Sequence, residues 1–419
     1  MRILFLSHYF PPEVNAPASR TYEHCREWVR AGHRVAVVTC APNHPRGVVY
    51  EGYRNRLWQE ERRDGIRVIR LWTFVTANQG FLKRTLGYVS FMVACMLAAP
   101  FLPKADVVLT TSPQFFNGLA GYPVSRIKHA AWVLEIRDLW PESIVVLGSL
   151  KSPMLIHMLE WLEFFAYRKA DAIVPVTDSF QRYMVARGIP GEKIEVIKNG
   201  VDVSLFQPLG GENPLRAELG FEGKLVFAYF GTLGMAHALE SVLDAAQLLR
   251  EHPQIVFLLV GDGAERKRLV ELREARGLSN VVILDQQPKA RMPMLWDLSS
   301  ASIVHLKKSP LFETVLPSKI FESMAMERPI VLGVKGEAAQ LVAAAQAGLA
   351  FEPENAAQLA NAVLRLASDS GAARRMGASG RQYILEHFNR TRLAAAYEIL
   401  LLRTAAAMPH SRGAIRRIG

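Results

Sequence analysis

Lys319 and Glu322 stand three residues apart in the segment LPSKIFESMAMERP, which covers residues 316–329. Pro317 suits the first turn of a helix, where its missing N–H costs nothing, and residues three apart share one helix face. A lysine at the start of such a helix can bind a diphosphate, and a carboxylate one turn later can accept hydrogen bonds from two ribose hydroxyls. The alternative is a surface ion pair worth about 0.3–0.5 kcal/mol. Because the segment joins a loop to an apolar strand, we favour a nucleotide site.

A glycine-containing loop follows the apolar segment 225–230, which has the pattern of a buried parallel strand. Gly231, Thr232 and Gly234 form this loop, and a helix is expected to begin near His237. Glycines allow the backbone to approach a phosphate closely, and the N-terminus of a helix offers free N–H groups to it. A lone Gly-x-x-Gly is weak evidence, because a tight turn between a strand and a helix gives the same pattern.

Two further loops follow strand-like segments in the same half of the chain. Gly261, Asp262 and Gly263 come after residues 255–260, but the third glycine of the dinucleotide fingerprint is absent, so a simple turn remains open. Gln286 comes after the next apolar segment, where amide and backbone groups could read a nucleobase edge. These loops predict nucleotide-binding residues at the carboxyl edge of a parallel sheet.

Charged and aromatic residues follow the apolar segment 131–136 in the first half of the chain. Arg137, Asp138, Trp140 and Glu142 lie in this loop. Asp138 could orient or deprotonate an attacking hydroxyl, and Trp140 could stack on a sugar ring. The simpler interpretation is that Asp138 only caps the following helix.

The loop after the first apolar segment, residues 3–7, reaches the same edge of the predicted sheet. It carries His8, Glu13, Asn15 and Arg20. Because the carboxyl ends of parallel strands meet at one edge, we expect these side chains to face the same ligand as the loop after residue 136.

Apolar strands alternate with helical segments in both halves of the 419-residue chain. Such alternation predicts parallel sheets with helices on both faces. We therefore expect an α/β fold of two Rossmann-like, doubly wound parallel-sheet domains that face each other across a cleft, with ligands bound by the loops after the strands. The expected strands cover residues 3–7, 35–39, 107–111, 131–136, 172–176 and 194–197 in the first half, and residues 225–230, 255–260, 281–284, 302–306 and 330–332 in the second.

The domain boundaries are predicted from the composition of the connecting segments. Residues 1–205 form the first domain, residues 206–224 a linker rich in glycine and proline, and residues 225–388 the second domain with the nucleotide motifs. Residues 389–407 form a last helix that is expected to return to the first domain, and residues 408–419 form a basic tail.

The formal net charge of +11 favours an anionic partner such as anionic lipid, nucleic acid or a phosphorylated substrate. The absence of zinc-finger spacing and of an aromatic RNA-binding motif speaks against nucleic acid. Cys25, Cys40 and Cys95 are too few and too far apart for a disulfide framework or a zinc site, and a reducing cytosol fits them best.

An uncharged apolar segment, residues 86–103, lies between Arg84 and Lys104. Its 18 residues are at the lower limit for a transmembrane helix. The strands at 3–7, 35–39 and 107–111 should share one sheet, so the chain cannot cross a bilayer between them. We therefore favour a helix that is buried or lies in the membrane interface over one that spans.

The chain resembles the retaining glycosyltransferases of the GT-B fold, the large family-four group, from Arg2 to about Leu402. The resemblance rests on VIKNGVDVSLFQP at residues 196–208, on the Gly-Asp-Gly turn and on LPSKIFESMAMERPIV. IRDLWPES at residues 136–143 and the opening HYFPPEVNAPASR resemble the subgroup that transfers amino- or acetamido-sugars during O-antigen, capsule and colanic-acid assembly.

The resemblance implies transfer of a sugar, with retention, from a nucleotide diphosphate donor, UDP-linked by expectation, to a lipid-diphosphate-linked or saccharide acceptor. It makes Asp138, Lys319 and Glu322 the catalytic residues and adds Thr314, Pro317 and Ser318 to the donor-binding loops, while the first-half loop residues become acceptor-binding. The sequence has no Asp-x-Asp pair, so Lys319 and helix N-termini are expected to stabilise the leaving diphosphate without a metal or other cofactor. The expected location is the cytoplasmic face of a bacterial inner membrane, as a peripheral protein.

Two departures from the family pattern keep alternatives open. Most members carry two glutamates separated by seven residues; Glu322 matches the second, but Thr314 stands at the first position, with Glu313 beside it. Most also carry an arginine and a lysine near the glycine loop, where this chain has Met235, Ala236 and His237. The alternatives are a nucleotide-sugar 2-epimerase of the same fold and a non-catalytic nucleotide-sugar-binding subunit of a membrane assembly, which Thr314 favours.

Overall fold

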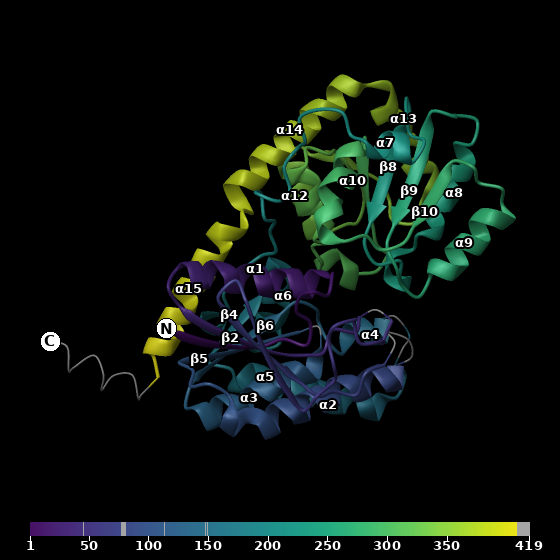
Figure 1. The fold of residues 1–419 in the computed structure, drawn as a ribbon. Helices are drawn as coiled ribbons and strands as arrows, with labels where there is room; N and C mark the ends of the chain where they lie inside the picture. Colours follow the sequence, from purple (N-terminus) through teal and green to yellow (C-terminus); the bar gives the residue numbers. More distant parts are fainter. Residues whose placement is uncertain (45, 77–80, 113, 147, 149, 409–419) are drawn as a thin grey trace. The chain divides into compact units, whose positions relative to one another are not determined.

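The computed structural model describes residues 1–408 apart from residues 45, 77–80, 113, 147 and 149. The chain divides into two compact units, one formed by Met1–Lys198 with Arg390–Gly419 and the other by Asn199–Asn389. Each unit is an α/β structure built on its own sheet (Figure 1). The predicted fold class, two doubly wound domains with parallel sheets, is confirmed.

The first unit contains a seven-stranded sheet in the order β3-β4-β2-β1-β5-β6-β7. All neighbouring strands are parallel except β3, which runs antiparallel to β4. The strands are β1 (Arg2–Leu6), β2 (Arg34–Cys40), β3 (Trp58–Arg63), β4 (Ile66–Leu71), β5 (Val107–Thr111), β6 (Ala131–Ile136) and β7 (Ala172–Pro175). The strand order reverses direction between β1 and β5, and ligands of open parallel sheets bind beside such a point.

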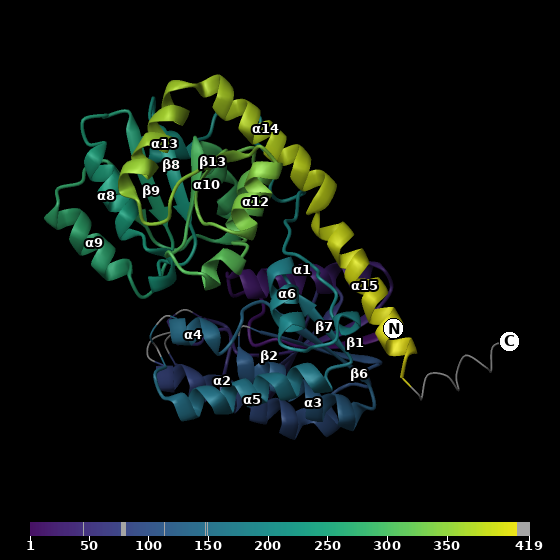
Figure 2. The same cartoon turned by 180° about the vertical axis from the view of Figure 1, so that it is seen from behind.

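Helices cover both faces of this sheet (Figures 1 and 2). The helices are α1 (Ala16–Arg30), α2 (Phe81–Ala98), η1 (Ala99–Phe101), α3 (Phe115–Lys128), α4 (Glu142–Val146), α5 (Pro153–Lys169), α6 (Asp178–Ala186), η2 (Gly191–Lys193) and α15 (Arg390–Ala406). On one face, Trp28 of α1 and Tyr397 of α15 join a single apolar core with strand residues such as Phe5. On the other face, Phe91 of α2 and Val124 of α3 form a second core.

Two elements of the first unit differ from the sequence prediction. The strand expected at residues 194–197 is reduced to an isolated bridge between Ile194 and Ile173. The hairpin of β3 and β4 was not predicted, because β3 consists mainly of charged residues and lacks the alternation of apolar and polar residues that indicates a strand. Its signal was the Asp64–Gly65 pair, whose φ angles of 49° and 79° match the tight turn that Asp-Gly favours between antiparallel strands.

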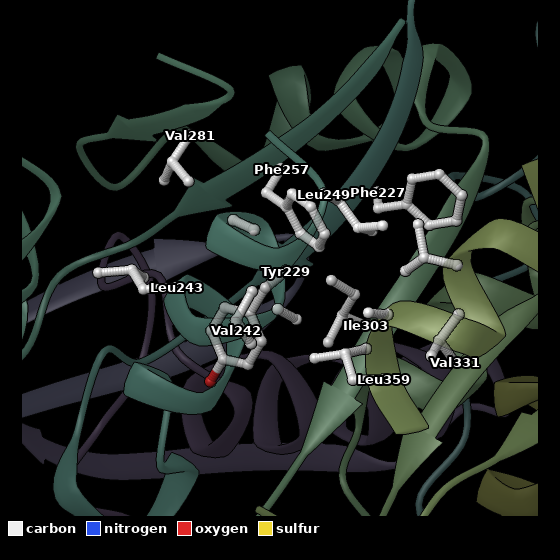
Figure 3. Packing of buried hydrophobic residues seen from close by; sticks show 14 of the residues in the cluster. Phe227, Tyr229, Val242, Leu243, Leu249, Phe257, Val281, Ile303, Val331 and Leu359 are labelled. Carbon is white, nitrogen blue, oxygen red and sulfur yellow. The ribbon is translucent and has the colours of Figure 1, made fainter. Parts of the chain in front are cut away.

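The second unit contains a six-stranded, fully parallel sheet in the order β10-β9-β8-β11-β12-β13. The strands are β8 (Leu225–Phe230), β9 (Ile255–Val260), β10 (Val281–Leu284), β11 (Ala301–His305), β12 (Ile330–Gly333) and β13 (Gly348–Ala350). The helices are α7 (Leu215–Glu218), η3 (Met235–His237), α8 (Glu240–Leu248), α9 (Arg266–Ala275), η4 (Lys289–Arg291), α10 (Met292–Leu298), η5 (Leu311–Thr314), α11 (Lys319–Ala325), α12 (Glu337–Ala344), α13 (Ala356–Ser368) and α14 (Ser370–His387). Phe227, Phe257 and Ile303 of the sheet pack on Val242 of α8 and Leu359 of α13 (Figure 3).

The segment 206–224, expected to be a linker, packs within the second unit. The Asn213 side chain donates to the Met294 carbonyl at 2.7 Å, and Leu215 is buried. The chain passes from the first unit to the second after Lys198 and back before Arg390. The ordered core of the second unit therefore begins before the glycine- and proline-rich stretch, not after it.

Helix α2 combines a buried face with an exposed apolar face. Residues Lys83–Phe101 are long and apolar enough to cross a membrane by length and composition alone, a test that core helices of soluble proteins also meet. Phe91 and Cys95 are completely buried against the sheet, whereas Leu86 and Leu97 are 57% and 72% exposed. Since β4 before the helix and β5 after it belong to one sheet, α2 lies on that sheet as a surface helix.

A buried ion pair joins α1 to strand β6 of the first sheet. The Arg20 guanidinium donates to the Glu135 carboxylate at 2.9 Å, and both side chains are at most 2% exposed. Arg20 also donates to the carbonyls of Ile197 and Lys198 at 2.9 Å, while the Thr111 hydroxyl donates to Glu135 at 2.8 Å. Burial alone would raise the pKa of Glu135, but these positive and hydrogen-bonding neighbours hold it below its usual value.

Arg20→Ala should destabilise the first unit strongly, because it leaves the Glu135 charge buried without its partner. Removal of one member of a buried ion pair costs about 3–5 kcal/mol. Urea unfolding followed by tryptophan fluorescence will measure this, since six of the seven tryptophans, all except Trp296, belong to the first unit.

Arg30→Ala is the matched control, because Arg30 lies on the same helix, is 63% exposed and pairs with Glu27 at 2.7 Å. Exposed pairs contribute about 0–1 kcal/mol, so this variant should unfold almost like the wild type. Equal destabilisation by the two substitutions would contradict a special role for the Arg20 pair.

Candidate functional site

The glycine loops of the second unit pack backbone against backbone. A Cβ atom on Gly261 would lie 1.8 Å from the Gly231 carbonyl oxygen, and one on Gly263 would lie 2.5 Å from the Leu233 carbonyl oxygen. All three glycines adopt positive φ angles between 133° and 156°. Glycine is therefore required at Gly261 and Gly263 by the contact of the two loops, and this contact fixes the shape of the loop after β8.

The remaining donor-loop residues have defined positions in this region. Thr232 is exposed in the loop after β8, and its carbonyl accepts a hydrogen bond from the Tyr229 hydroxyl at 2.7 Å. The Asp262 carboxylate accepts from the Gly263 N–H, so it stabilises its own turn. Gln286 is exposed at the carboxyl end of β10. Gly234 precedes the short 3₁₀ turn η3, and α8 begins only at Glu240, so the helix expected next to the glycine loop starts later than predicted.

Lys319 begins α11 and reaches beneath the Gly231 turn. Its Nζ lies 3.6 Å from the centroid of the Tyr229 ring and 3.5 Å from the position of a Cβ on Gly231. The residue is 8% exposed, and within the part of the chain that the structure describes its Nζ has no hydrogen-bond acceptor. Burial lowers the pKa of Lys319 to about 7, against a smaller raising effect of Glu322. An anion bound at the Gly231 turn would supply the counter-charge that this ammonium lacks.

His237 was not predicted as a site residue, yet it belongs to the same group. Its ring lies edge-on to Tyr229 at 5.8 Å, and its buried Nδ1 has no partner among the described residues. Burial, assisted by the Lys319 charge, lowers the pKa of His237 to about 3, so the ring is neutral. Its signal in the sequence was its position, where most relatives carry a basic residue, but only the structure brings it to Lys319.

The other residues of the LPSKIFE segment surround α11. The Glu322 carboxylate accepts a hydrogen bond from Trp296 Nε1 at 3.3 Å. The Thr314 hydroxyl donates to the Leu311 carbonyl at 2.6 Å, which keeps it within the η5 turn. The carbonyls of Pro317 and Ser318 accept the first hydrogen bonds of α11 and thereby position Lys319.

In the first unit, three of the residues expected to bind an acceptor make contacts that stabilise the fold. Glu13 is buried and accepts hydrogen bonds from the N–H groups of Asn43 and His44 at 2.9 and 3.0 Å, so it joins the loops after β1 and β2. Asn15 caps α1 by accepting from the Ala18 N–H. Arg20 is buried and donates to Glu135 and to the carbonyls of Ile197 and Lys198. The Glu13 carboxylate, the Asn15 Oδ1 and the Arg20 guanidinium therefore have partners within the fold, and the binding of an acceptor by these three residues stays a prediction.

The loop after β6 mixes structural and reactive features. Trp140 stacks on Phe115 at 4.9 Å, so one face of its ring is covered by protein. The Arg137 guanidinium has two buried nitrogens without a partner among the described residues, and burial lowers its pKa to about 9. Burial raises the pKa of Asp138 to about 6, although the nearby Ser143 hydroxyl and Leu139 N–H lower it. Glu142 begins α4 beside them. Asp138 is therefore poised to exchange a proton near neutral pH.

A small pocket lies at the carboxyl edge of the first sheet. The loops after β1, β2 and β4 form it together with the first half of α2, and His8 is the one predicted site residue in it. The lining consists of His8, Tyr9, Asn43, His44, Thr73, Phe74, Thr76, Arg84, Gly87 and Tyr88. The other lining residues were not predicted, because they come from separate segments that only the fold of the sheet assembles.

Comparison with known proteins agrees with both halves of this arrangement. Residues 15–200 match the glycosyl transferase 4-like domain, and residues 212–383 match glycosyl transferases group 1. Two parallel-sheet units, with glycine loops and a buried lysine at the strand ends of the second, define a glycosyltransferase of the GT-B fold. The chain belongs to this family, with a 4-like first domain and a group 1 second domain.

Among its relatives is the colanic acid biosynthesis glycosyl transferase WcaI of Escherichia coli K12. The two chains are 27% identical over 336 residues, which cover 78% of this chain and 81% of WcaI. Sucrose-phosphate synthase from Thermosynechococcus elongatus has the same fold, with a TM-score of 0.76 at 20% identity over 97% of this chain and 99% of that one. HepE of Anabaena, in complex with UDP-glucose, also has this fold, with a TM-score of 0.71 at 19% identity. The match covers 96% of this chain and 100% of HepE.

Binding of a nucleotide diphosphate sugar should depend on pH through Lys319. A bound diphosphate raises the lysine pKa above the value of about 7 in the free protein, so binding takes up a proton above neutral pH. The affinity for UDP-glucose should be constant well below pH 7 and should fall above it, approaching about tenfold per pH unit. Calorimetry in buffers of different ionisation enthalpy will measure the affinity and the proton uptake together.

Lys319→Arg is the control, because a guanidinium keeps its charge over this range and should abolish the pH dependence. The neighbouring histidines His237 and His305 should not contribute to the pH dependence of binding above pH 7, since burial lowers the pKa of both. The same slope in both proteins would refute the assignment to Lys319.

Proposed function

We propose that this protein transfers a sugar, with retention, from a UDP-linked donor to a lipid-linked saccharide acceptor in the synthesis of a bacterial surface polysaccharide. The observation that carries the proposal is the buried ammonium of Lys319 beneath the Gly231 turn, without a counter-ion among the described residues. The relationship to WcaI, named for colanic acid biosynthesis, supports the pathway, and the likeness to HepE bound to UDP-glucose supports the donor.

The chemistry of the proposal centres on the leaving diphosphate. Lys319, beneath the Gly231 turn, meets the negative charge that develops as the bond to the sugar breaks, which is preorganised electrostatic stabilisation. Asp138, on the first unit, positions the acceptor hydroxyl and can accept its proton, because its pKa of about 6 lies close to neutral pH. This scheme requires no metal, and activity that disappears with a chelator and returns with Mg²⁺ would contradict it.

The identity of the donor sugar is proposed from sequence resemblance. IRDLWPES, residues 136–143, resembles the transferases of amino- and acetamido-sugars, so UDP-linked acetamido-sugars are the first donors to test. Most relatives carry a glutamate at the position of Thr314, whose hydroxyl is bonded to the Leu311 carbonyl. We therefore expect the contact with the donor sugar at this position to differ from that of most relatives.

The test is a transfer assay that combines a panel of UDP-sugars, then GDP-sugars, with a lipid-diphosphate-sugar acceptor. NMR of the product should show the anomeric configuration of the donor. Incubation with the donor alone distinguishes a 2-epimerase, which would form an epimer without an acceptor. Tight donor binding without turnover on any acceptor would favour the non-catalytic subunit instead.

Glu322→Gln should weaken donor binding about tenfold to a hundredfold, because a neutral amide replaces a charged acceptor of ribose hydroxyls. Calorimetric titration with the donor found in the transfer assay measures this loss. Glu327→Gln is the control, since Glu327 follows the same helix and is not proposed to contact donor. Unchanged affinity in a folded Glu322→Gln protein would remove the ribose assignment.

We also propose peripheral attachment to the cytoplasmic face of the inner membrane. Exposed apolar side chains on α2, η1 and α5 support it; they are Leu86, Val93, Met96, Leu97, Phe101, Met154, Met158 and Trp161, here called the α2–α5 surface. Both α2 and α5 pack against α3, so these side chains belong to one layer of helices (Figures 1 and 2). Basic residues flank the surface, and each adds about 1 kcal/mol near an anionic bilayer.

Replacement of Leu97, Phe101 and Trp161 by serine should reduce flotation with anionic liposomes at least tenfold, because each exposed side chain loses apolar contact with lipid. These three side chains are 72%, 78% and 66% exposed, so their removal leaves the core intact. High salt should release part of the wild-type protein.

The control variant replaces Leu248 and Leu385, exposed apolar residues of the second unit, by serine. It should float like the wild type. If wild-type protein stays in solution with anionic liposomes at low salt, the proposal of peripheral attachment is wrong.

A further inference from the structure

The pocket of the first unit has a rigid wall on α2. A Cβ on Gly87 would lie 3.1 Å from the Phe74 carbonyl oxygen, so the helix approaches the loop after β4 closely. The Ser90 hydroxyl accepts from the Phe74 N–H at 2.8 Å and donates to the Gly87 carbonyl, also at 2.8 Å. These contacts hold the first half of α2, including Arg84 and Tyr88, against the strand ends.

His8 forms the floor of the pocket as a neutral polar group. It is 6% exposed, and the rings of Tyr9, Tyr88 and Phe91 surround its imidazole edge-on at 5.1–5.2 Å. Its Nδ1 has no hydrogen-bond partner among the described residues. Burial lowers the pKa of His8 to about 3, so the ring can both donate and accept a hydrogen bond at neutral pH.

The electrostatic character of the pocket is cationic. Arg84 is the only lysine, arginine, aspartate or glutamate in the lining, and within the described part of the chain no carboxylate pairs with it. Glu13 is bonded to the N–H groups of the lining residues Asn43 and His44, and burial raises its pKa to about 7. Its carboxyl group is therefore only partly ionised near neutral pH and only partly offsets the charge of Arg84. An uncompensated guanidinium at the mouth of a polar pocket favours an anionic ligand.

The remaining lining suits a saccharide. Threonine and tyrosine hydroxyls, an asparagine amide and the neutral imidazole can bind sugar hydroxyls, and the aromatic rings of Tyr9, Phe74 and Tyr88 offer apolar faces to a sugar ring. This mixture of one cation, several neutral polar groups and aromatic rings distinguishes the pocket from a purely apolar lipid site.

We propose that this pocket binds the phosphorylated end of the acceptor saccharide, with Arg84 on the phosphate and His8 on a hydroxyl of the adjoining sugar. The inference rests on the proposed function, since it identifies the ligand of the first unit as its acceptor. It assigns the acceptor to the class of sugar phosphates, whether lipid-linked or soluble. The exposed apolar side of α2 leads away from the same pocket, which favours the lipid-linked source.

The experiment compares glucose 1-phosphate with methyl glucoside, an uncharged probe of similar size, by NMR titration. Saturating UDP is present throughout, so that neither probe occupies the nucleotide site of the second unit. The wild type should bind the phosphorylated probe more tightly. Arg84→Gln should weaken its binding about tenfold to a hundredfold and leave the uncharged probe unchanged. His8→Phe should weaken both probes.

Lys83→Gln is the matched control, because it removes the same charge from the neighbouring, exposed position of the same helix. It should leave both probes unchanged. An equal loss with Lys83→Gln and Arg84→Gln, or no preference of the wild type for the phosphorylated probe, would overturn the proposal.

The transfer assay then distinguishes the two sources of phosphate. With a lipid-diphosphate-sugar acceptor, Arg84→Gln should raise KM and leave the affinity for the UDP-sugar donor unchanged. If transfer occurs and Arg84→Gln has no effect on any acceptor, the pocket assignment fails while the proposed function stands. If the wild type neither binds nor uses any nucleotide sugar, the proposed function fails independently of the pocket.

Discussion

The ion pair between Arg20 and Glu135 connects helix α1, strand β6 and the segment where the chain leaves the first unit. Glu135 lies near the carboxyl end of β6, Arg20 on the helix that follows β1, and the carbonyls of Ile197 and Lys198 at the point where the chain leaves the unit. Arg390, where the chain returns, pairs with Glu23 on the same helix at 2.7 Å. Because a buried charge is costly without its partner, these pairs specify one arrangement of sheet, helix and chain crossings. The same arrangement positions the loop after β1, and with it the pocket around His8.

The second unit depends on a different kind of electrostatic feature. The buried charges of Arg20 and Glu135 in the first unit neutralise each other, whereas the Lys319 ammonium rests on an aromatic ring and lacks a carboxylate contact in the described residues. The contact between the Gly231 and Gly261 loops keeps the backbone above it fixed. The charge of Arg20 is therefore paired within the fold, and that of Lys319 is available to the donor diphosphate that we propose as its ligand. This difference explains why Arg20 and Lys319, both buried basic residues after strands, have opposite roles.

Much of the fold could be predicted from the sequence, because parallel strands buried on both faces appear as continuous apolar runs bounded by loops. The β3–β4 hairpin was not predicted in this way, because the edge strand β3 is exposed to solvent and carries charged residues. Lys319 and the glycine loops could be predicted as neighbours because loops at the carboxyl ends of one sheet converge. Arg20 could not be placed, because its partner is 115 residues away. Glu135 was the missed signal, a charged residue inside an otherwise apolar strand. The pocket residues Thr73, Phe74, Thr76, Arg84, Gly87 and Tyr88 were also missed, because no local pattern marks a wall formed by three loops and a helix.

Helix α15 makes the first unit discontinuous in sequence, and this affects how the protein is made. Tyr397, Leu400 and Leu401 complete the core around Trp28, and the indole of Trp28 donates to the Ala394 carbonyl at 3.0 Å. A ribosome delivers these residues only after the whole of the second unit, which is contiguous from Asn199 to Asn389. The second unit can therefore fold during synthesis, whereas the first keeps an uncovered apolar face until α15 has been synthesised. A nascent chain truncated before residue 390 would expose that face to chaperones and to other chains, so premature termination would affect the amino-terminal unit most.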